Sequence, residues 1–401
     1  MRSCTSGEEA SSVGEGTGAG QAVSEDRPKG ALTGIKVVEV AAVGPAPFGA
    51  MVMADMGASV IRVDRPDRIQ EHPYLARGRR SIAVNLKDPR GTKVLLDLLD
   101  DADVLIEGYR PGVAEKLGFG PDTCLQRYPK LVYARMTGWG QTGPYSPLAG
   151  HDINYIALAG VLGALGGENC PPFPPLNLVG DFGGGGMLLA FGVLCALVER
   201  SRSGQGQVVD AAMVDGTGLL MTSIYEMLAR GEWIPRRGVN MLDGGAYFYG
   251  VYETSDGGYI AVGAIEPKFH ARFLEALGLP AQECPSQWDR SGWSDMRARI
   301  AEVIGRHSRK EWEHRLERVD ACVVPVLSLD EVPNHPHVRA RNGFVDQGGQ
   351  MVPSPAPRMS RTPPCVTRRA PCPGEHTDEI LAELGYGSSE IEQLRAWGTV
   401  A

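Results

Sequence analysis

Two side chains able to carry acid–base or nucleophilic chemistry stand next to each other in "AGHDINYIALAG", His151 followed by Asp152. Adjacent residues on a helix do not face each other, so at most one of the two easily points into a given pocket. Histidine suits proton transfer because its pKa lies near neutrality, whereas aspartate also serves enzymes as a nucleophile. Taken alone, the pair is most simply explained by Asp152 acting as the N-cap of a helix over "INYIALAG".

Two further carboxylates also lie close to the start of a predicted helix. Asp181 lies in "VGDFGGGG", and Glu266 ends an apolar stretch in "VGAIEPKFH", just before Pro267 starts a predicted helix. Four consecutive glycines destabilise a helix by about 1 kcal/mol each relative to alanine, so the run indicates close approach of the backbone to something. Asp181 is therefore a candidate functional residue, whereas helix capping is the simpler explanation of Glu266.

A basic set, Arg65, Lys87, Arg110 and Lys116, lies at or near the ends of predicted strands. These residues either form solvated surface charge or anchor a phosphate-bearing ligand through charge-assisted hydrogen bonds. The sequence has no GxxxxGK[ST] loop and no GxGxxG motif after a strand, so it is neither a P-loop nor a dinucleotide fingerprint protein. The net charge of −8 disfavours a nucleic-acid partner.

The first half of the chain alternates predicted strands and helices, which is typical of an α/β domain with a parallel sheet. The predicted strands are 34–40, 59–66, 81–86, 103–109, 130–138 and 207–213, and the predicted helices between them include 46–58 and 88–102. Ligands of such sheets bind beyond the carboxyl ends of the strands. The basic set lies at this edge.

The second half begins with the apolar run Met187–Val198, whose 12 residues fall short of a membrane span and predict a buried core helix. One long helix over 215–233 follows. A hairpin over 246–265, turning at Asp256-Gly257, then opens a smaller α+β unit with helices 267–278, 294–306 and 309–318 and a strand over 321–327. The Pro- and Arg-rich tail reads as a linker or a surface strap that ends in helices 376–385 and 388–396.

The predicted division of the chain has five parts: a disordered tail (1–30), a large α/β domain (31–215), a linker helix (216–245), a small α+β domain (246–330) and a C-terminal segment that returns to the large domain (331–401). The eight cysteines form no CxxC pair, so we expect no metal site. No signal peptide or membrane span is visible, and we expect a cytoplasmic protein.

Long motifs in a fixed order resemble the class III CoA-transferase superfamily, and within it the racemases of α-methylacyl-CoA. The matching blocks include "GIKVVEVAAVGPAPF", "DVLIEGYRPGVAEKLG", "ARMTGWGQTGPYSPLAGHDINYIALAG", "PPLNLVGDFGGGG" and "YIAVGAIEPKF". The resemblance runs from about Leu32 to about Leu381. It implies an interlocked homodimer, in which a Rossmann-like large domain of one chain meets the small domain of the other.

The resemblance also implies the roles of individual residues. His151 and Asp181 match the two catalytic acid–base groups, and Glu266, supplied by the partner chain, matches the glutamate that supports the histidine. The residues that match contacts to the CoA substrate are Arg65, Val84, Asn85, Leu86, Lys87, Gly108, Tyr109, Arg110, Pro111, Gly112, Lys116, Gly150, Asp152, Ile153, Asn154 and Tyr155. Lys116 stands where close relatives carry arginine, which keeps the charge but loses a bidentate phosphate contact.

The reaction implied is racemisation or epimerisation of 2-methylacyl-CoA thioesters. The proton α to the thioester carbonyl is acidic, and two acid–base groups on opposite faces of a planar enolate invert the centre without a cofactor. The alternative is a CoA-transferase that moves CoA between carboxylic acids, with Asp152 as nucleophile. His151, Asp181 and Glu266 together favour the racemase.

Overall fold

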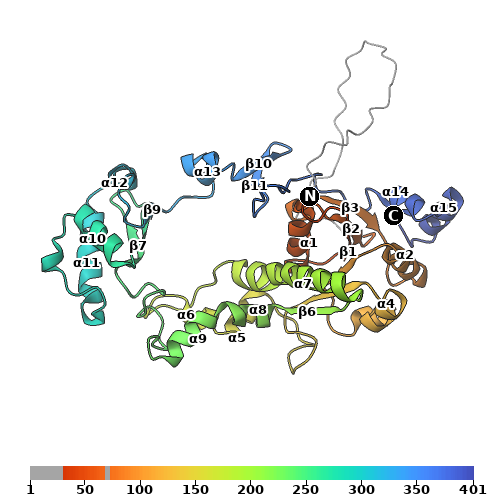
Figure 1. Ribbon diagram of the computed structural model, residues 1–401, viewed down its shortest axis with the longest axis horizontal. Helices are drawn as coiled ribbons and strands as arrows, with labels where there is room; N and C mark the ends of the chain where they lie inside the picture. The colour runs from red at the N-terminus through yellow and green to blue at the C-terminus, as the bar shows by residue number, and fades with distance from the viewer. Residues whose placement is uncertain (1–29, 68–72) are drawn as a thin grey trace, which may run out of the picture.

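The computed structural model describes residues 30–67 and 73–401, so the expected disordered tail lies outside the described residues except for Gly30. A six-stranded sheet dominates the larger part of the chain (Figure 1). Its strands are β1 (Lys36–Val40), β2 (Ser59–Asp64), β3 (Arg79–Ala83), β4 (Val104–Glu107), β5 (Val132–Thr137) and β6 (Val208–Ala212). The spatial order is β3-β2-β1-β4-β5-β6 and every pairing is parallel, which confirms the predicted α/β sheet.

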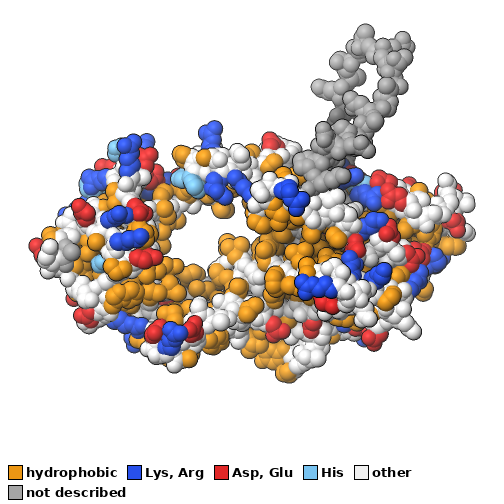
Figure 2. Space-filling model, viewed as in Figure 1, with side chains coloured by type: hydrophobic (Ala, Val, Ile, Leu, Met, Phe, Trp, Pro, Cys, Tyr) orange, Lys and Arg blue, Asp and Glu red, His pale blue; other side chains and the backbone are white. Residues whose placement is uncertain are grey.

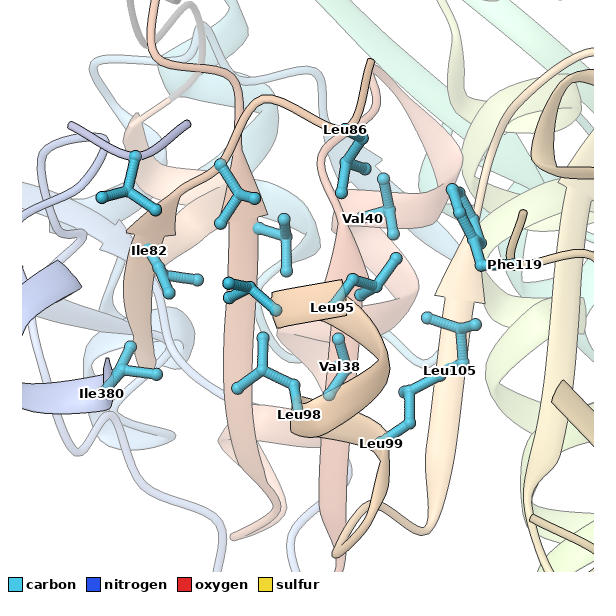
Figure 3. Close-up of a cluster of buried hydrophobic side chains, with 14 of the residues drawn as sticks. Val38, Val40, Ile82, Leu86, Leu95, Leu98, Leu99, Leu105, Phe119 and Ile380 are labelled. Carbon is cyan, nitrogen blue, oxygen red and sulfur yellow. The ribbon is translucent and has the colours of Figure 1, made fainter. Parts of the chain in front are cut away.

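Helices cover both faces because alternate strand residues point to opposite sides. On one face, α1 (Pro45–Asp55) and α7 (Leu188–Ser203) pack over Val37, Val60 and their neighbours. On the other face lie α2 (Pro89–Leu99), α3 (Val113–Lys116), α4 (Pro121–Arg127), α14 (Thr377–Glu383) and α15 (Ser388–Ala396). Figure 3 shows the α2 leucines seated against Val38 of β1 and Leu105 of β4.

The strand predicted over 81–86 begins and ends earlier than expected. β3 stops at Ala83, and Val84 instead forms a single antiparallel bridge with Val400. The Asn85 N–H donates to the Thr399 carbonyl at 2.8 Å. The last residues of the chain, Thr399 and Val400, therefore satisfy backbone groups just after β3. The ion pair of Arg80 with Glu383 also links the C-terminal segment to this strand.

A ten-residue π-helical stretch, η2 (Leu178–Met187), runs directly into α7. The prediction of a buried helix over Met187–Val198 is wrong for its outer side, because Phe191 and Val198 are 64% and 54% exposed while Leu189 and Val193 are buried. The continuous stretch Leu178–Ser203 is long and apolar enough to cross a membrane by length and composition alone, and 44% of its most apolar window is buried inside the protein. The inner side packs on the sheet like an ordinary core helix.

Two short helices, α5 (Asp152–Leu158) and α6 (Val161–Ala164), precede η2, and two more, α8 (Met213–Leu220) and α9 (Thr222–Ala229), follow β6. The single helix predicted over 215–233 is wrong. The chain leaves helical geometry at Met221, whose ψ is 3°, and helix α9 ends at Ala229. Because α8 runs from 213 to 220, it crosses the domain boundary predicted between 215 and 216.

The smaller unit has its own core around Phe248, Phe273 and Trp312. An antiparallel sheet of β7 (Tyr249–Glu253), β8 (Tyr259–Gly263) and β9 (Val323–Pro325) packs on α10 (Pro267–Ala276), α11 (Trp293–Ile304) and α12 (Arg309–Leu316). The predicted hairpin is confirmed, with Gly257 in the left-handed region at φ 75°. The described residues also form short 3₁₀ helices along the chain: η1 (Pro73–Ala76), η3 (Ala281–Glu283), η4 (Arg290–Gly292) and η5 (Val332–Asn334).

The tail between the two units is more structured than a linker. It contains α13 (Pro336–Ala340) and the hairpin β10 (Phe344–Gln347) and β11 (Gln350–Pro353). Figure 2 shows an opening through the molecule, with the small unit on one side and the large sheet on the other. Helices α8 and α9 lie along one rim of it, and α13 with the β10–β11 hairpin lies along the opposite rim (Figure 1). The described chain is therefore ring-shaped.

Candidate active site

A cavity of about 600 Å³ opens at the carboxyl ends of β1 and β4, where the strand order reverses. This switch point is the place where open α/β sheets bind ligands. The residues that line the cavity are Ala41, Ala42, Val43, Gly44, Pro45, Ala46, Arg65, Gly108, Tyr109, Arg110, Pro111, Met136, Thr137, Gly138, Trp139, Ser146, Leu148, Ala149, Gly150, His151, Asp152, Tyr155, Asn177, Asp181 and Met213.

His151 lies at the mouth of this cavity as the residue that precedes α5. Its backbone is extended (φ −133°, ψ 173°), and its N–H donates to the Asn154 side-chain carbonyl at 3.0 Å. His151 is exposed and lines the cavity. His151, and not Asp152, is therefore the N-cap residue of α5, which removes the simplest structural explanation of the pair.

Asp152 is the first residue of α5 and is only 7% exposed. Its Oδ2 accepts a hydrogen bond from the backbone N–H of Asp181 at 2.7 Å, while Oδ1 is buried and has no hydrogen-bond partner among the described residues. Gly180 leaves room for this contact, since a Cβ there would lie 2.5 Å from the same carboxylate oxygen. Asp152 thus ties the start of η2 to α5.

Asp181 points into the cavity from η2, close to the first turn of α1. A Cβ on Gly44 would lie 3.2 Å from its Oδ2, so Gly44 allows the carboxylate to approach the backbone. Burial raises the pKa of Asp181 above its ordinary value, against a lowering effect of the hydrogen bond donated by Asn177 (3.3 Å). The negative charge of Asp152 raises the pKa further, and His151 lowers it.

The glycine run Gly183–Gly186 packs against protein backbone. A Cβ on Gly184 would lie 2.6 Å from the Thr217 nitrogen in α8, and one on Gly186 would lie 2.7 Å from the Pro45 carbonyl in α1. The predicted close approach is confirmed, and its object is the neighbouring helices. The glycines therefore let η2 pack closely against α1 and α8, and this packing places Asp181 at the cavity.

The predicted substrate contacts divide into those at the cavity and those outside its lining. Arg65 and Arg110 line it, together with Gly108, Tyr109, Pro111, Gly150, Asp152 and Tyr155. The described lining does not include Val84, Asn85, Leu86, Lys87, Gly112, Lys116, Ile153 or Asn154. Of these, Val84 and Leu86 have buried side chains in the core, whereas Lys87 and Lys116 are exposed.

Glu266 lies in the small unit as the N-cap residue of α10, and its side chain makes no capping hydrogen bond. The capping explanation is therefore wrong. Glu266 also does not belong to the cavity lining within the described residues of this chain. The structure brings His151 and Asp181 together and leaves Glu266 apart from them.

Sequence reasoning missed three features of the cavity. The segment 41–46, from the end of β1 into the start of α1, lines the cavity. Asn177 donates a hydrogen bond to Asp181, and Trp139 stacks edge-on against Tyr155 with 4.7 Å between the ring centroids. The segment 41–46 follows the first strand of a βαβ unit, and that position was a usable signal. Burial raises the pKa of Tyr155 to about 12, so its hydroxyl stays protonated near neutrality.

The arrangement offers two acid–base groups of different chemical type at one cavity, with cationic side chains at its rim. Among residues 30–67 and 73–401, no three His, Cys, Asp or Glu side chains are grouped to hold a metal ion. The chemistry that this site supports directly is proton transfer between His151, Asp181 and a bound acid.

Comparison with known proteins gives a consistent assignment. The family model for CoA-transferase family III matches residues 32–377. The chain is 48% identical to the mouse protein named Alpha-methylacyl-CoA racemase, over 91% of this chain and 96% of that protein. Its identity to the human protein of the same name is 46%, again over 91% of this chain and 96% of that protein.

A solved structure agrees in fold. A CAIB/BAIF family protein from Brucella suis superimposes with a TM-score of 0.77 at 24% identity, over 89% of this chain and all of that one. The family expected from the sequence motifs is confirmed. The chain belongs to CoA-transferase family III.

Proposed function

We propose that the protein racemises 2-methylacyl-CoA thioesters by moving the proton on the carbon next to the thioester carbonyl. The observation that carries the proposal is the meeting of His151 and Asp181 at one cavity while Asp152 is tied to the η2 backbone. The names of the mouse and human relatives support the same reaction.

Each residue has a defined part in this reaction. One of His151 and Asp181 removes the α-proton and the other returns a proton to the opposite face of the planar enolate. Burial raises the pKa of Asp181, which favours the protonated form that an acid needs. Because the two side chains supply both proton transfers, the proposed reaction uses no cofactor, and CoA is part of the substrate.

Asp152 is poorly placed to act as the nucleophile of a CoA-transferase. One of its oxygens is held by the Asp181 N–H, and the side chain is 7% exposed. An attacking carboxylate has to reach the thioester carbon, and the buried, hydrogen-bonded geometry of Asp152 opposes this. The racemase reaction is therefore the better match to the geometry.

The CoA moiety is proposed to lie along the segments that carry the basic set. Arg65 and Arg110 line the cavity, and the exposed Lys87 and Lys116 lie on segments that follow β3 and β4. Guanidinium and ammonium groups form charge-assisted hydrogen bonds with phosphate oxygens. The acyl end then points towards His151 and Asp181.

We also propose that the working unit is a homodimer in which a second copy supplies Glu266. Three observations support this. Glu266 is separate from the cavity of its own chain, the outer side of α7 is apolar and exposed, and the ring-shaped chain has room for a partner to pass through (Figure 2). Exposed Val251 and Val324 add a second apolar surface on the small sheet.

The test is to incubate the protein with (R)-2-methylacyl-CoA in D2O and follow the α-carbon by NMR. The expected result is deuterium at that carbon together with loss of optical purity. The matched variants His151→Ala and Asp181→Ala should each lose at least about 100-fold in rate. Full exchange in both variants contradicts the proposal, and CoA transfer to an added carboxylic acid without exchange identifies a transferase instead.

A further inference from the structure

A group of three charges, two buried and one partly exposed, lies beneath the segment that carries Arg110 and Lys116. Its centre is Arg135 of β5, which is 5% exposed. Its Nε donates to Glu107 Oε1 at 2.8 Å, and its two terminal nitrogens donate to the two carboxylate oxygens of Glu115 at 2.8 and 3.3 Å. One planar guanidinium therefore links the end of β4 to helix α3.

Both carboxylates hold parts of the same segment. The second oxygen of Glu107 accepts the backbone N–H of Tyr109 at 2.7 Å, which fixes the start of the loop that contains Arg110. Glu115 is the immediate neighbour of Lys116 in α3. Between them, Gly112 turns the chain at φ 82°, a conformation that glycine adopts readily. The two ends of the segment 108–116 are thus tied to one side chain.

We infer that Arg135 is a positioning residue for CoA binding, which sets the places of Arg110 and Lys116 relative to the cavity without touching the substrate. The inference rests on the proposed function, because the ligand in question is the CoA moiety. Arg135 is outside the cavity lining, whereas Met136 and Thr137, next to it on β5, belong to it. The guanidinium points away from the cavity, towards the face of the sheet that α3 covers.

Stability alone is a weak reason for this arrangement. Removing charges from water is unfavourable, and apolar side chains of similar volume often replace a buried ion pair without loss. Burial raises the pKa of Glu107 despite Arg135. Burial also acts to raise the pKa of Glu115, but the hydrogen bond and charge of Arg135, together with backbone hydrogen bonds, outweigh it and lower that pKa. Without the guanidinium, two carboxylates would stand beside the side chains expected to meet phosphate groups. Arg135 therefore serves orientation and local charge balance.

The experiment measures the dissociation constant of free CoA by calorimetry for the wild type, Arg135→Met and Arg135→Lys. Arg135→Met should weaken CoA binding by at least about tenfold, since it frees both carboxylates. Arg135→Lys keeps the positive charge but loses the planar set of donors, so its affinity for CoA should lie between those of the wild type and Arg135→Met. In racemisation assays the KM should rise in the same order, with kcat within about twofold of the wild type.

The matched control is Arg77→Lys. Arg77 is also buried and also pairs with a carboxylate through two nitrogens, at 3.0 and 2.6 Å from Asp55, but it lies beside α1 at the start of β3. This variant should lower the melting temperature and leave CoA binding unchanged. If Arg135→Met does not fold, Glu115→Gln takes its place, because that carboxylate is 41% exposed and its loss is tolerable.

The results distinguish the inference about Arg135 from the proposed function. Effects of Arg135→Lys and Glu115→Gln that are less than additive on CoA binding support a shared contact. Wild-type affinity for CoA in folded Arg135 variants, or weakening no greater than in Arg77→Lys, overturns the inference alone. A wild-type protein that binds no CoA overturns the proposed function and, with it, this inference.

Discussion

At the scale of single residues, the neighbours His151 and Asp152 have separate tasks although they are adjacent in the chain. The imidazole of His151 is exposed at the cavity, whereas the carboxylate of Asp152 is buried and bonded to the Asp181 backbone. Asp152 also contributes to the raised pKa of Asp181 through its charge. The pair therefore controls both ends of the proposed proton transfer, one directly and the other through a neighbour.

The raised pKa of Asp181 predicts a stability effect. A carboxyl group whose pKa in the folded state is above its unfolded value, 3.8, stabilises the protein only while it is protonated. At neutral pH its charge opposes folding, so Asp181→Asn should raise the melting temperature by about 1–2 °C. As the pH falls towards 4 the gain should shrink, because the folded-state carboxyl regains its proton and its charge no longer opposes folding.

Melting curves of the wild type and Asp181→Asn between pH 4 and 8 check this prediction. Asp330→Asn is the control, since it makes the same substitution at an exposed residue far from Asp181 in the sequence. A gain in Asp181→Asn that is constant across the range contradicts the assignment of the raised pKa.

The residues proposed to transfer protons could be predicted from the sequence, but not all of their hydrogen-bond partners could. Asp181 stood out because of the unusual glycine run after it. Asn177 has no such mark, and its hydrogen bond to Asp181 lies at the start of η2, a π-helix that no periodic pattern in the sequence predicted.

At the scale of elements, the glycine run predicts a sharp dependence on side-chain size. A Cβ on Gly186 would meet the Pro45 carbonyl and the Phe48 ring, both at 2.7 Å. Gly186→Ala should therefore force η2 away from α1, destabilise the protein by about 1–3 kcal/mol and reduce activity by displacing Asp181.

Gly218→Ala is the matched control for this change. Gly218 lies inside α8, and no heavy atom lies within 4 Å of a Cβ built there. The substitution should stabilise the helix by about 0.5–1 kcal/mol. Denaturant titrations give the free energy of unfolding of both variants. Equal changes in the two would contradict a role for the close packing of η2 on α1.

The docking of the chain's last segment on β3 predicts a second effect at this scale. Val400 is 2% exposed and bridges Val84, which precedes Asn85 and Lys87. Val400→Asp buries a carboxylate without a partner, and should destabilise the protein by about 2 kcal/mol or more. The KM for the CoA substrate should rise because the segment 84–87 loses its support.

Gln393→Asp provides the comparison, because it adds the same charge at an exposed position of α15. Thermal unfolding together with KM measurements distinguishes the two variants. Similar behaviour of both would contradict a specific role for the Val84–Val400 bridge.

Elements with strong periodicity were predicted well, and weakly marked ones were not. The six parallel strands and α2 follow from runs of apolar residues at strand or helix spacing. The β10–β11 hairpin was missed although Gly348-Gly349, both in the left-handed region, mark its turn. The surrounding prolines and arginines obscured the alternation of its short strands. The break at Met221 has no glycine or proline to announce it.

At the scale of the whole molecule, the separation of Glu266 from the cavity predicts complementation between two inactive chains. His151→Ala and Glu266→Gln should each be inactive alone. If sites form between chains, each mixed dimer has one intact site, and random pairing of equal amounts restores about a quarter of wild-type activity.

The two variants must be co-expressed for this test, because the chains of a folded, interlocked dimer cannot exchange partners. Light scattering should give about 86 kDa, twice the 43.0 kDa chain. A monomeric mass, or no recovery of activity in a preparation shown to contain mixed dimers, would contradict the shared site.

The contact of α14 and the 398–401 segment with β3 also has a consequence for synthesis. These segments are translated about 300 residues after the strand that they cover, as the 303-residue span from Arg80 to Glu383 shows. From the completion of β6 at Ala212 until these segments emerge, one edge of the parallel sheet exposes its unpaired backbone groups to other nascent chains. The ribosome-bound protein should therefore depend on chaperone protection during the later part of its elongation, and slower translation should lower its soluble yield.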